Sequence, residues 1–343
     1  MEKYFAASNS SEGFCSYYDE VFNPQNFYKI YVIKGGSGTG KAFFMKEVAK
    51  CAELNGFSVR YIYCSSDADS LDGIIINEQK IAVLDGTSPH VYEPKYVGAC
   101  ESFVNLADFL DEKMLASSRK VIENITSEKK RGFERVYRTL SAYRKLSENI
   151  EDIIFPCLKH EKIKKYAFHF ADGLEKGNGE EEHLLTRAIG MRGLSLFDTY
   201  FENAKIYYEI NDYFETAFFM MREIYSSMKE KKVDLRISNN PIIKERIDVL
   251  CAVNSGLTFE INNRMDDNIR SINMRRFVDG NAISKIRQEY RAMVRVRDNI
   301  LNLALGEFEN IKKYHFILEE IYGSAMDFAA KEQFTREFCN KIF

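Results

Sequence analysis

The stretch Lys34-Gly35-Gly36-Ser37-Gly38-Thr39-Gly40-Lys41-Ala42 decides the fold of the first half of this chain. The apolar run Ile30-Tyr31-Val32-Ile33 precedes it and predicts a buried strand, and the residues from Phe43 to Ala52 have the spacing and composition of a helix. Glycines between a strand and a helix let backbone N–H groups face one anion, and the helix N-terminus adds partial positive charge. The stretch therefore predicts a phosphate-binding loop.

The loop fits the Walker A pattern G-x-x-x-x-G-K through Gly35, Gly40 and Lys41, and Lys41 is expected to reach the β- and γ-phosphates of ATP. The nucleotide-binding residues predicted here are Gly35, Gly36, Ser37, Gly38, Thr39, Gly40, Lys41, Ala42 and Phe43. Ala42 stands where Ser or Thr normally supplies a hydroxyl ligand to Mg²⁺. We therefore expect nucleotide binding to persist and hydrolysis to be weakened.

A second apolar run, Ile81-Ala82-Val83-Leu84-Asp85, has a Walker B pattern. A buried parallel strand would deliver Asp85 to the sheet edge, where its carboxylate can hold Mg²⁺ through water. Gly86 follows, so the acidic base that many ATPases place there is absent. Candidates to orient a water molecule are Asp67, His90 and Glu93.

Between these runs, Val59-Arg60-Tyr61-Ile62-Tyr63 alternates and predicts a strand. The polar segment 64–73 follows and contains Asp67, Asp69 and Asp72. Carboxylates at the C-terminal end of a strand indicate a ligand site, because ligands bind at that edge of a parallel sheet. The alternative is a solvated turn in which Asp and Ser cap backbone N–H groups.

Length and composition bound the possible functions. The 343 residues favour two domains, and the net charge of −3 gives no reason to expect nucleic acid or an anionic membrane as partner. The seven cysteines include no C-x-x-C pair, which favours a reducing compartment and no structural zinc. We find no targeting segment and no apolar run of transmembrane length, so we expect a cytoplasmic protein.

From about residue 105 to residue 165 the pattern becomes helical and locally basic, which we interpret as a helical hairpin. It could carry an arginine finger, a nucleic-acid contact or only a solvated face, and Arg131, Arg135 and Arg138 are the arginines to test. The glycine-rich segment 172–180 predicts a linker between domains 1–171 and 181–343.

The second half repeats the first. Lys29-Ile30-Tyr31 matches Lys205-Ile206-Tyr207, and Ala42-Phe43-Phe44-Met45 matches Ala217-Phe218-Phe219-Met220. Between the second pair of matches stands Asn211-Asp212-Tyr213-Phe214-Glu215-Thr216, so two carboxylates replace the glycines and the lysine. This loop would repel an anion. A helical tail from residue 284 to residue 343 mirrors the first half's hairpin.

The combination resembles a poorly characterised family of bacterial tandem P-loop proteins, regarded as ATPases or nucleotide kinases and familiar from spore-forming Firmicutes. The segments that carry the resemblance are residues 33–41, 64–73, 84–90 and 104–109. The family pattern has Ser after the loop lysine, where this chain has Ala42. The resemblance implies a duplicated P-loop fold that binds a nucleotide, and it names no substrate.

The sequence thus predicts an α/β protein with a duplicated P-loop NTPase fold, whose mainly parallel sheets are flanked by helices and whose halves each end in a long helical hairpin. We expect it to bind ATP and Mg²⁺ at one intact loop, with Lys41, Asp85, Asp67 and His90 as catalytic candidates and Asp85 as the metal ligand. The alternatives are a kinase for a nucleotide or small molecule, and a non-enzymatic nucleotide-gated scaffold or nucleic-acid binder. Expected partners are a second copy or another protein, bound through the helical hairpins; nucleic acid is not favoured, and no membrane partner is expected.

Overall fold

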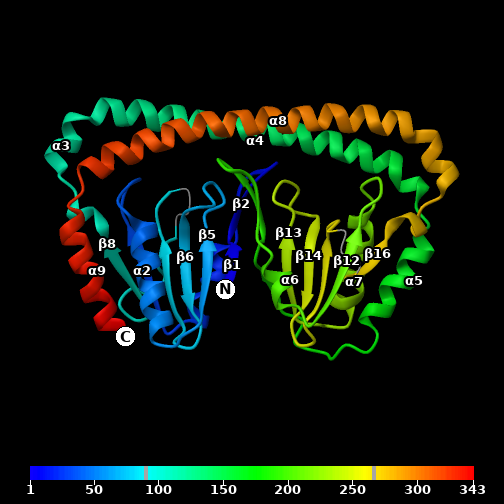
Figure 1. Ribbon diagram of the computed structural model, residues 1–343, viewed down its shortest axis with the longest axis horizontal. Helices are drawn as coiled ribbons and strands as arrows, with labels where there is room; N and C mark the ends of the chain where they lie inside the picture. The colour runs from blue at the N-terminus through cyan, green and yellow to red at the C-terminus, as the bar shows by residue number, and fades with distance from the viewer. Residues whose placement is uncertain (89–91, 265–267) are drawn as a thin grey trace.

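The computed structural model describes residues 1–88, 92–264 and 268–343. Two sheets stand side by side beneath a pair of long helices that runs across both of them (Figure 1). The N-terminus lies near the middle of the molecule, and the C-terminus lies beside the first sheet.

The first sheet has six strands, in the order β1 (Glu2–Phe5), β5 (Val59–Tyr63), β6 (Leu71–Ile76), β7 (Ile81–Asp85), β4 (Lys29–Lys34) and β8 (Glu101–Asn105). Only β6 among these runs antiparallel to its neighbours, so the sheet is mixed and mostly parallel. The strand–loop–helix order predicted around the glycine loop is confirmed, because β4 leads through that loop into α2 (Lys41–Leu54).

The second sheet has the same plan. Its order is β9 (Glu181–His183), β13 (Leu235–Asn239), β14 (Ile247–Ala252), β15 (Leu257–Ile261), β12 (Ile206–Asn211) and β16 (Arg270–Asn273), and β14 is its antiparallel strand. The helix after β12 is α7 (Ala217–Glu230), which has 14 residues, as α2 has. The predicted α/β class and the mainly parallel sheets are confirmed.

The residues that are equivalent in the two halves of the structure differ by one position from those that the sequence comparison matched. Lys80 O accepts from Tyr28 N and Lys29 N, and Gly256 O accepts in the same way from Lys205 N and Ile206 N. Ile206 is therefore equivalent to Lys29, not to Ile30. The short identities lie one residue out of step because the register is set by which side chains face the core, and an identity of three or four residues does not report that.

Two small hairpins join the halves. β2 (Ala7–Ser10) pairs with β3 (Gly13–Ser16), and β10 (Arg187–Gly190) pairs with β11 (Gly193–Leu196). Between the sheets, Phe5 N donates to Leu185 O at 2.7 Å and Leu185 N donates to Phe5 O at 3.0 Å. The edges of the two sheets are thus tied together.

The long helices are α4 (Arg119–Ile154) and α8 (Gly280–Ser324), which pack against each other along their length. At 1.5 Å per residue, the 36 residues of α4 span roughly 54 Å, enough to pass from one sheet to the other. The other helices are α1 (Tyr18–Val21), α3 (Glu112–Ser117), α5 (His160–Ala171), α6 (Thr199–Asn203) and α9 (Phe328–Ile342). Short 3₁₀ turns are η1 (Pro24–Asn26), η2 (Leu106–Phe109), η3 (Phe155–Cys157) and η4 (Met274–Phe277).

The expected hairpin within residues 105–165 does not form. α4 is one continuous helix that carries the chain to the second half, where α5 packs on α7, and α8 carries it back, so that α9 packs on α2. Gly132 could have interrupted α4, but it lies within the helix at a close contact with α8. A Cβ at this position would lie 2.6 Å from Ile311 Cγ1 of α8. The basic residues of α4 therefore lie on a helix pair that bridges the halves.

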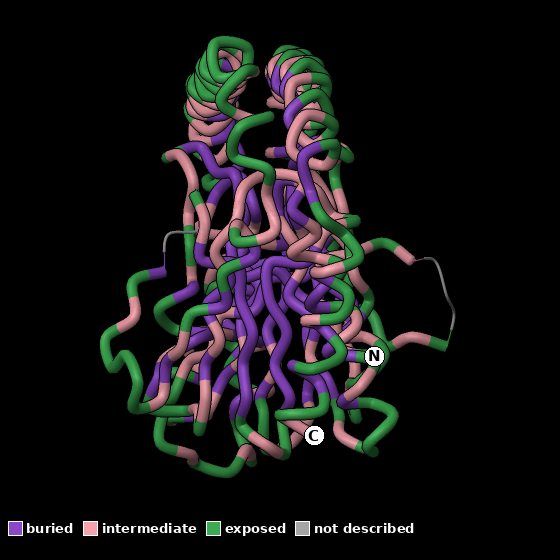
Figure 2. Tube along the Cα trace, turned by 90° about the vertical axis from the view of Figure 1, so that its left-hand side faces the viewer, coloured by how far each residue is buried: buried purple, intermediate pink, exposed green. Residues whose placement is uncertain are grey.

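Two helices cover one face of each sheet: one lies between that sheet's strands in the sequence, and the other reaches it at the far end of a long bridging helix. Phe44 and Met45 of α2 pack beside Phe338 of α9 over the first sheet, and α7 and α5 cover the second sheet together. Burial is concentrated in the sheets, and the outer faces of the long helices are exposed (Figure 2). No helix in the described ranges is both long and apolar enough to cross a membrane.

Candidate functional site

The glycine loop between β4 and α2 has the backbone of an anion cradle. Gly38 (φ +73°) and Gly40 (φ +75°) adopt the left-handed conformation that favours glycine. Thr39 is fully buried, and its hydroxyl donates to Gly36 O at 3.0 Å, which fixes the turn. Because α2 begins at Lys41, its free N–H groups and partial positive charge lie at the loop.

Lys41 holds its charge over the loop. Its Nζ donates to Gly36 O at 2.7 Å and Gly35 O at 3.3 Å, and lies 3.5 Å from Asp85 Oδ2. Both side chains are largely buried, at 13% and 12% exposure. The structure thus brings together the lysine and the aspartate that the sequence analysis paired.

Asp85 reaches the loop because β7 lies beside β4 in parallel, with Asp85 opposite Ile33. Its Oδ1 accepts from Thr87 N at 2.9 Å and from Thr87 Oγ1 at 2.6 Å. The glycine after it has a steric reason, because a Cβ on Gly86 would lie 2.4 Å from Val32 Cγ1. An acidic base therefore has no room at that position.

Asp72 is not in a solvated turn. It lies on the antiparallel strand β6, is 4% exposed, and faces the same cavity as Asp85. Burial, the largest cause, and the charge of Asp85 together raise the pKa of Asp72 to about 8, although hydrogen bonds with Cys64 and Tyr18 and the charge of Lys41 act in the opposite direction. A short polar stretch between two strands does not reveal that its last residues begin a third.

The loop opens into a cavity of about 470 Å³, within the usual range for a ligand site. Six consecutive loop residues, 37–42, line it. The other lining residues come from both halves of the chain and are Cys64, Ser66, Asp67, Ser70, Leu71, Asp72, Asp85, Thr87, Ser88, Lys129, Phe133, Met191, His315, Glu319, Gly323 and Phe328. Ser37 Oγ is buried and has no hydrogen-bond partner within the part of the chain described, which leaves a polar group for a ligand to satisfy.

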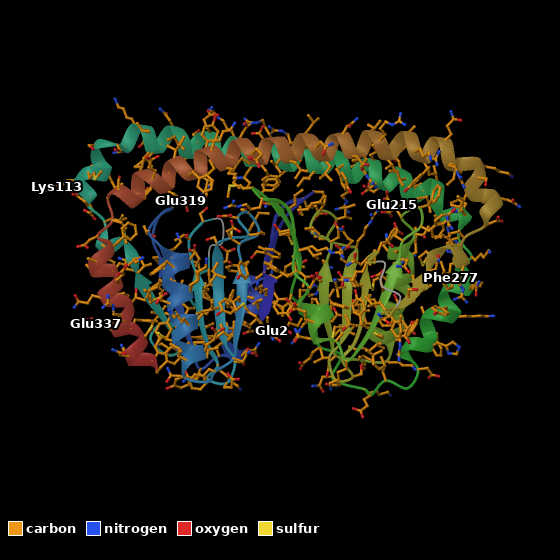
Figure 3. The ribbon with its side chains drawn as sticks, viewed as in Figure 1. Glu2, Lys113, Glu215, Phe277, Glu319 and Glu337 are labelled. Atoms are coloured by element: carbon orange, nitrogen blue, oxygen red, sulfur yellow. The ribbon has the colours of Figure 1, made fainter. Side chains whose placement is uncertain are left out.

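The roof over the loop comes from the second half. A Cβ on Gly36 would lie 2.9 Å from Tyr322 Cε1, and one on Gly38 would lie 2.5 Å from Glu319 O, both on α8. Figure 3 labels Glu319 on α8 directly above the first half. The loop glycines therefore serve the turn and the close approach of α8.

A buried lysine from α9 stands beside the loop. Lys331 is 2% exposed, and its Nζ lies 4.7 Å from the ring centre of Phe43 and 5.1 Å from that of Phe328. Burial lowers the pKa of Lys331. Phe43, expected among the nucleotide contacts, is turned toward this lysine and does not line the cavity.

The β10–β11 hairpin completes one side of the cavity. Met191 N donates to Ser66 O at 2.8 Å, and Arg192 binds Asp67 at 3.0 Å and Asp69 at 2.6 Å. Asp67, a candidate to orient water, is therefore engaged by a guanidinium from the other half. Sequence reasoning missed Arg192.

The remaining candidates lie elsewhere. His90 is outside the described residues, and Glu93 is exposed and does not line the cavity. Arg131 binds Glu128, and Arg135 binds Glu307 on the outside of the helix pair. The cation of α4 that reaches the cavity is Lys129, which sequence reasoning missed.

The α4 aromatic residues Phe133, Tyr137 and Tyr143 pack between the long helices. Lys129 lies four residues before Phe133, hence on the same helical face, and that spacing was the available signal.

The equivalent loop of the second half is closed by its own side chains. Asp212 Oδ1 accepts from Ala217 N at 2.9 Å, and Glu215 binds the Arg297 guanidinium from α8. Phe214 (φ +59°) and Glu215 (φ +55°) keep a left-handed backbone without glycine. The second loop therefore already contains an internal anion.

A metal ion at the first loop would be held mainly by the oxygens of a bound nucleotide and by water. In residues 1–88, 92–264 and 268–343, no group of three or more His, Cys, Asp or Glu side chains could hold a metal ion. Mg²⁺ in nucleotide sites keeps several waters and binds phosphate oxygens, and Asp85 is the carboxylate that would hold it through water. Ala42 lines the cavity and offers no side-chain oxygen.

Comparison with known proteins adds no assignment: no family model matches the chain, and neither a curated protein nor a solved structure gives a significant match.

Proposed function

We propose that this protein binds ATP at the glycine loop of its first half and is a P-loop NTPase with weakened hydrolysis. The observation that carries the proposal is the position of Lys41 Nζ, over the carbonyls of its own loop and 3.5 Å from Asp85, at the floor of a cavity of about 470 Å³. Phosphate oxygens are stronger partners for an ammonium than neutral carbonyls. Lys41 would exchange its loop carbonyls for the β- and γ-phosphates.

Three features support slow turnover. Ala42 supplies no hydroxyl for Mg²⁺, and steric contact with Val32 keeps residue 86 a glycine, so no carboxylate follows Asp85. Asp67, which could orient water, is bound to Arg192. Bound Mg²⁺ would supply charge neutralisation, while Lys41 and the loop N–H groups hold the phosphates.

Calorimetric titration with ATP and Mg²⁺ tests the proposal. We expect Lys41→Ala to weaken ATP binding at least tenfold, because a charge-assisted contact contributes roughly 1.5 to 3 kcal/mol. Lys50→Ala is the matched control, since Lys50 is an exposed lysine of the same helix. ATP binding by Lys41→Ala as tight as by the parent would contradict the proposal.

One observation favours a second candidate, transfer of phosphate to a small acceptor. Asp72 lines the cavity, and with a pKa of about 8 it would accept a hydroxyl proton in the fraction of molecules whose carboxyl is ionised, a fraction that grows as the pH approaches 8. Product analysis separates the two functions. ADP formation that no acceptor accelerates would argue against the kinase.

A further inference from the structure

The two long helices are repeats of each other, and the alignment of one with the other needs no gap. Leu110 bridges Met326, and Leu158 bridges Val278, so a constant shift of 168 residues relates the segments (278 against 110, 326 against 158). The matching backbone bonds follow the same shift, since Asp111 N donates to Ala325 O and Asp279 N to Cys157 O, both at 2.8 Å. This shift places Lys129 of α4 in the position of Arg297 of α8.

Arg297 shows what this helix position does when the loop below it holds an anion. Arg297 is 7% exposed. Its guanidinium binds the Glu215 carboxylate and lies 5.2 Å from the ring centre of Tyr143. Glu215 belongs to the loop that corresponds to the glycine loop, and it lies beneath the helix pair over the second half (Figure 3). In the second half, therefore, a carboxylate of the chain itself fills the place above the loop where an anion would sit.

In the first half the corresponding cation lies above a loop that has no carboxylate of its own. Lys129 lines the cavity above the glycine loop, and that loop contains no acidic side chain. Its Nζ lies 3.0 Å from His315 Nδ1, and His315 Nε2 lies 3.4 Å from Glu319 Oε1. Burial lowers the pKa of Lys129, which a bound anion would offset.

We infer that Lys129 is the helix-borne group that binds the terminal phosphate of the nucleotide, on the opposite side from Lys41. The inference rests on the proposed function, and it makes the site selective for a triphosphate. A diphosphate occupies the loop and Lys41 but leaves Lys129 with His315. A triphosphate ties α4 to the loop and so joins the bridging helix pair to the nucleotide state.

Titration of ATP and ADP against the full chain tests the inference. We expect Lys129→Met to raise the Kd for ATP roughly tenfold or more and the Kd for ADP less than about threefold, since one charge-assisted contact is lost only with ATP. Lys129→Arg keeps the charge and should retain the preference for ATP. Lys130→Met, at the exposed neighbouring lysine, is the control.

The outcomes distinguish this inference from the proposed function. If the parent binds both nucleotides and Lys41→Ala loses both, but Lys129→Met weakens ATP and ADP equally or neither, the Lys129 assignment is overturned and ATP binding stands. If the parent binds neither nucleotide, the proposed function fails and the inference falls with it. A melting curve for each variant confirms that it is folded, and Lys129→Gln, which removes the charge but keeps a polar side chain, takes the place of Lys129→Met if that variant is not.

Discussion

The buried carboxyl of Asp72 makes the stability of this protein depend on pH in a predictable direction. Burial and the charge of Asp85 raise the pKa of Asp72 from 3.8 to about 8. The folded protein therefore keeps a proton on Asp72 that the unfolded chain releases. Because the folded state binds more protons between about pH 4 and about pH 8, this group lowers the free energy of unfolding as pH rises.

The size of this pH dependence follows from the one proton that the folded state binds and the unfolded state has released. Each pH unit in that window removes about 1.4 kcal/mol, so from about pH 5 to about pH 7 the loss is roughly 3 kcal/mol. Asp72→Asn has nearly the same shape and does not titrate. We expect the stability of Asp72→Asn relative to the parent to grow by that amount over the same interval.

Urea unfolding without nucleotide, followed by circular dichroism at several pH values, measures this difference. The control is Asp152→Asn, an exposed aspartate on α4. A parent and an Asp72→Asn variant whose stability changes in parallel from about pH 5 to about pH 7 would refute the assignment of a raised pKa to Asp72.

Three more predictions follow from single side chains. Ala42→Ser should raise Mg²⁺-dependent ATP turnover in a phosphate-release assay, and an unchanged rate would show that the missing hydroxyl is not limiting. Glu215→Ala should lower the free energy of unfolding by about 3 kcal/mol in urea, because it leaves the buried Arg297 with the exposed Asp298 carboxylate at 3.4 Å in place of its close partner, and a loss below about 1 kcal/mol would contradict this role. Lys331→Ile should stabilise the protein on the order of 1 kcal/mol near neutral pH, since Ile163 fills the equivalent place in the other half and the pKa of Lys331 is lowered by burial. That gain should shrink as pH rises through 10.5, because the lysine becomes neutral in both states only above this value, and a pH-independent gain would exclude a charge penalty.

The helix pair gives the two halves different roles although they share one plan. The position occupied by Lys129 above an open loop is occupied by Arg297 above a loop closed by Glu215. The duplicated half thus shows, with its own side chains, how a helix cation meets an anion on this fold. Its loop is not expected to accept a nucleotide, since Glu215 and Asp212 already occupy it.

Local pattern in the sequence was enough to predict the strand, glycine loop and helix around Lys41, the strand that delivers Asp85, and the duplication of the whole layout. These features depend on contacts between residues near in sequence and on the period of apolar positions, which the order of residues records directly. The pairing of Lys41 with Asp85 followed as well, because parallel strands end at one edge of a sheet.

Only the tertiary structure decided which half each long helix serves and which distant side chains meet at the loop. The direction in which α4 leaves the first sheet is fixed by its packing on α8, and apolar periodicity on one helix does not name its partner. For that reason Lys129, Arg192 and Glu319 could not be placed from sequence. By sequence alone Asp72 lay in a polar segment that could be a ligand site or a turn, whereas the structure places it on a strand paired on both sides. Contacts between residues far apart in the chain are created by folding, so the walls of this cavity exist only once both halves have exchanged their helices.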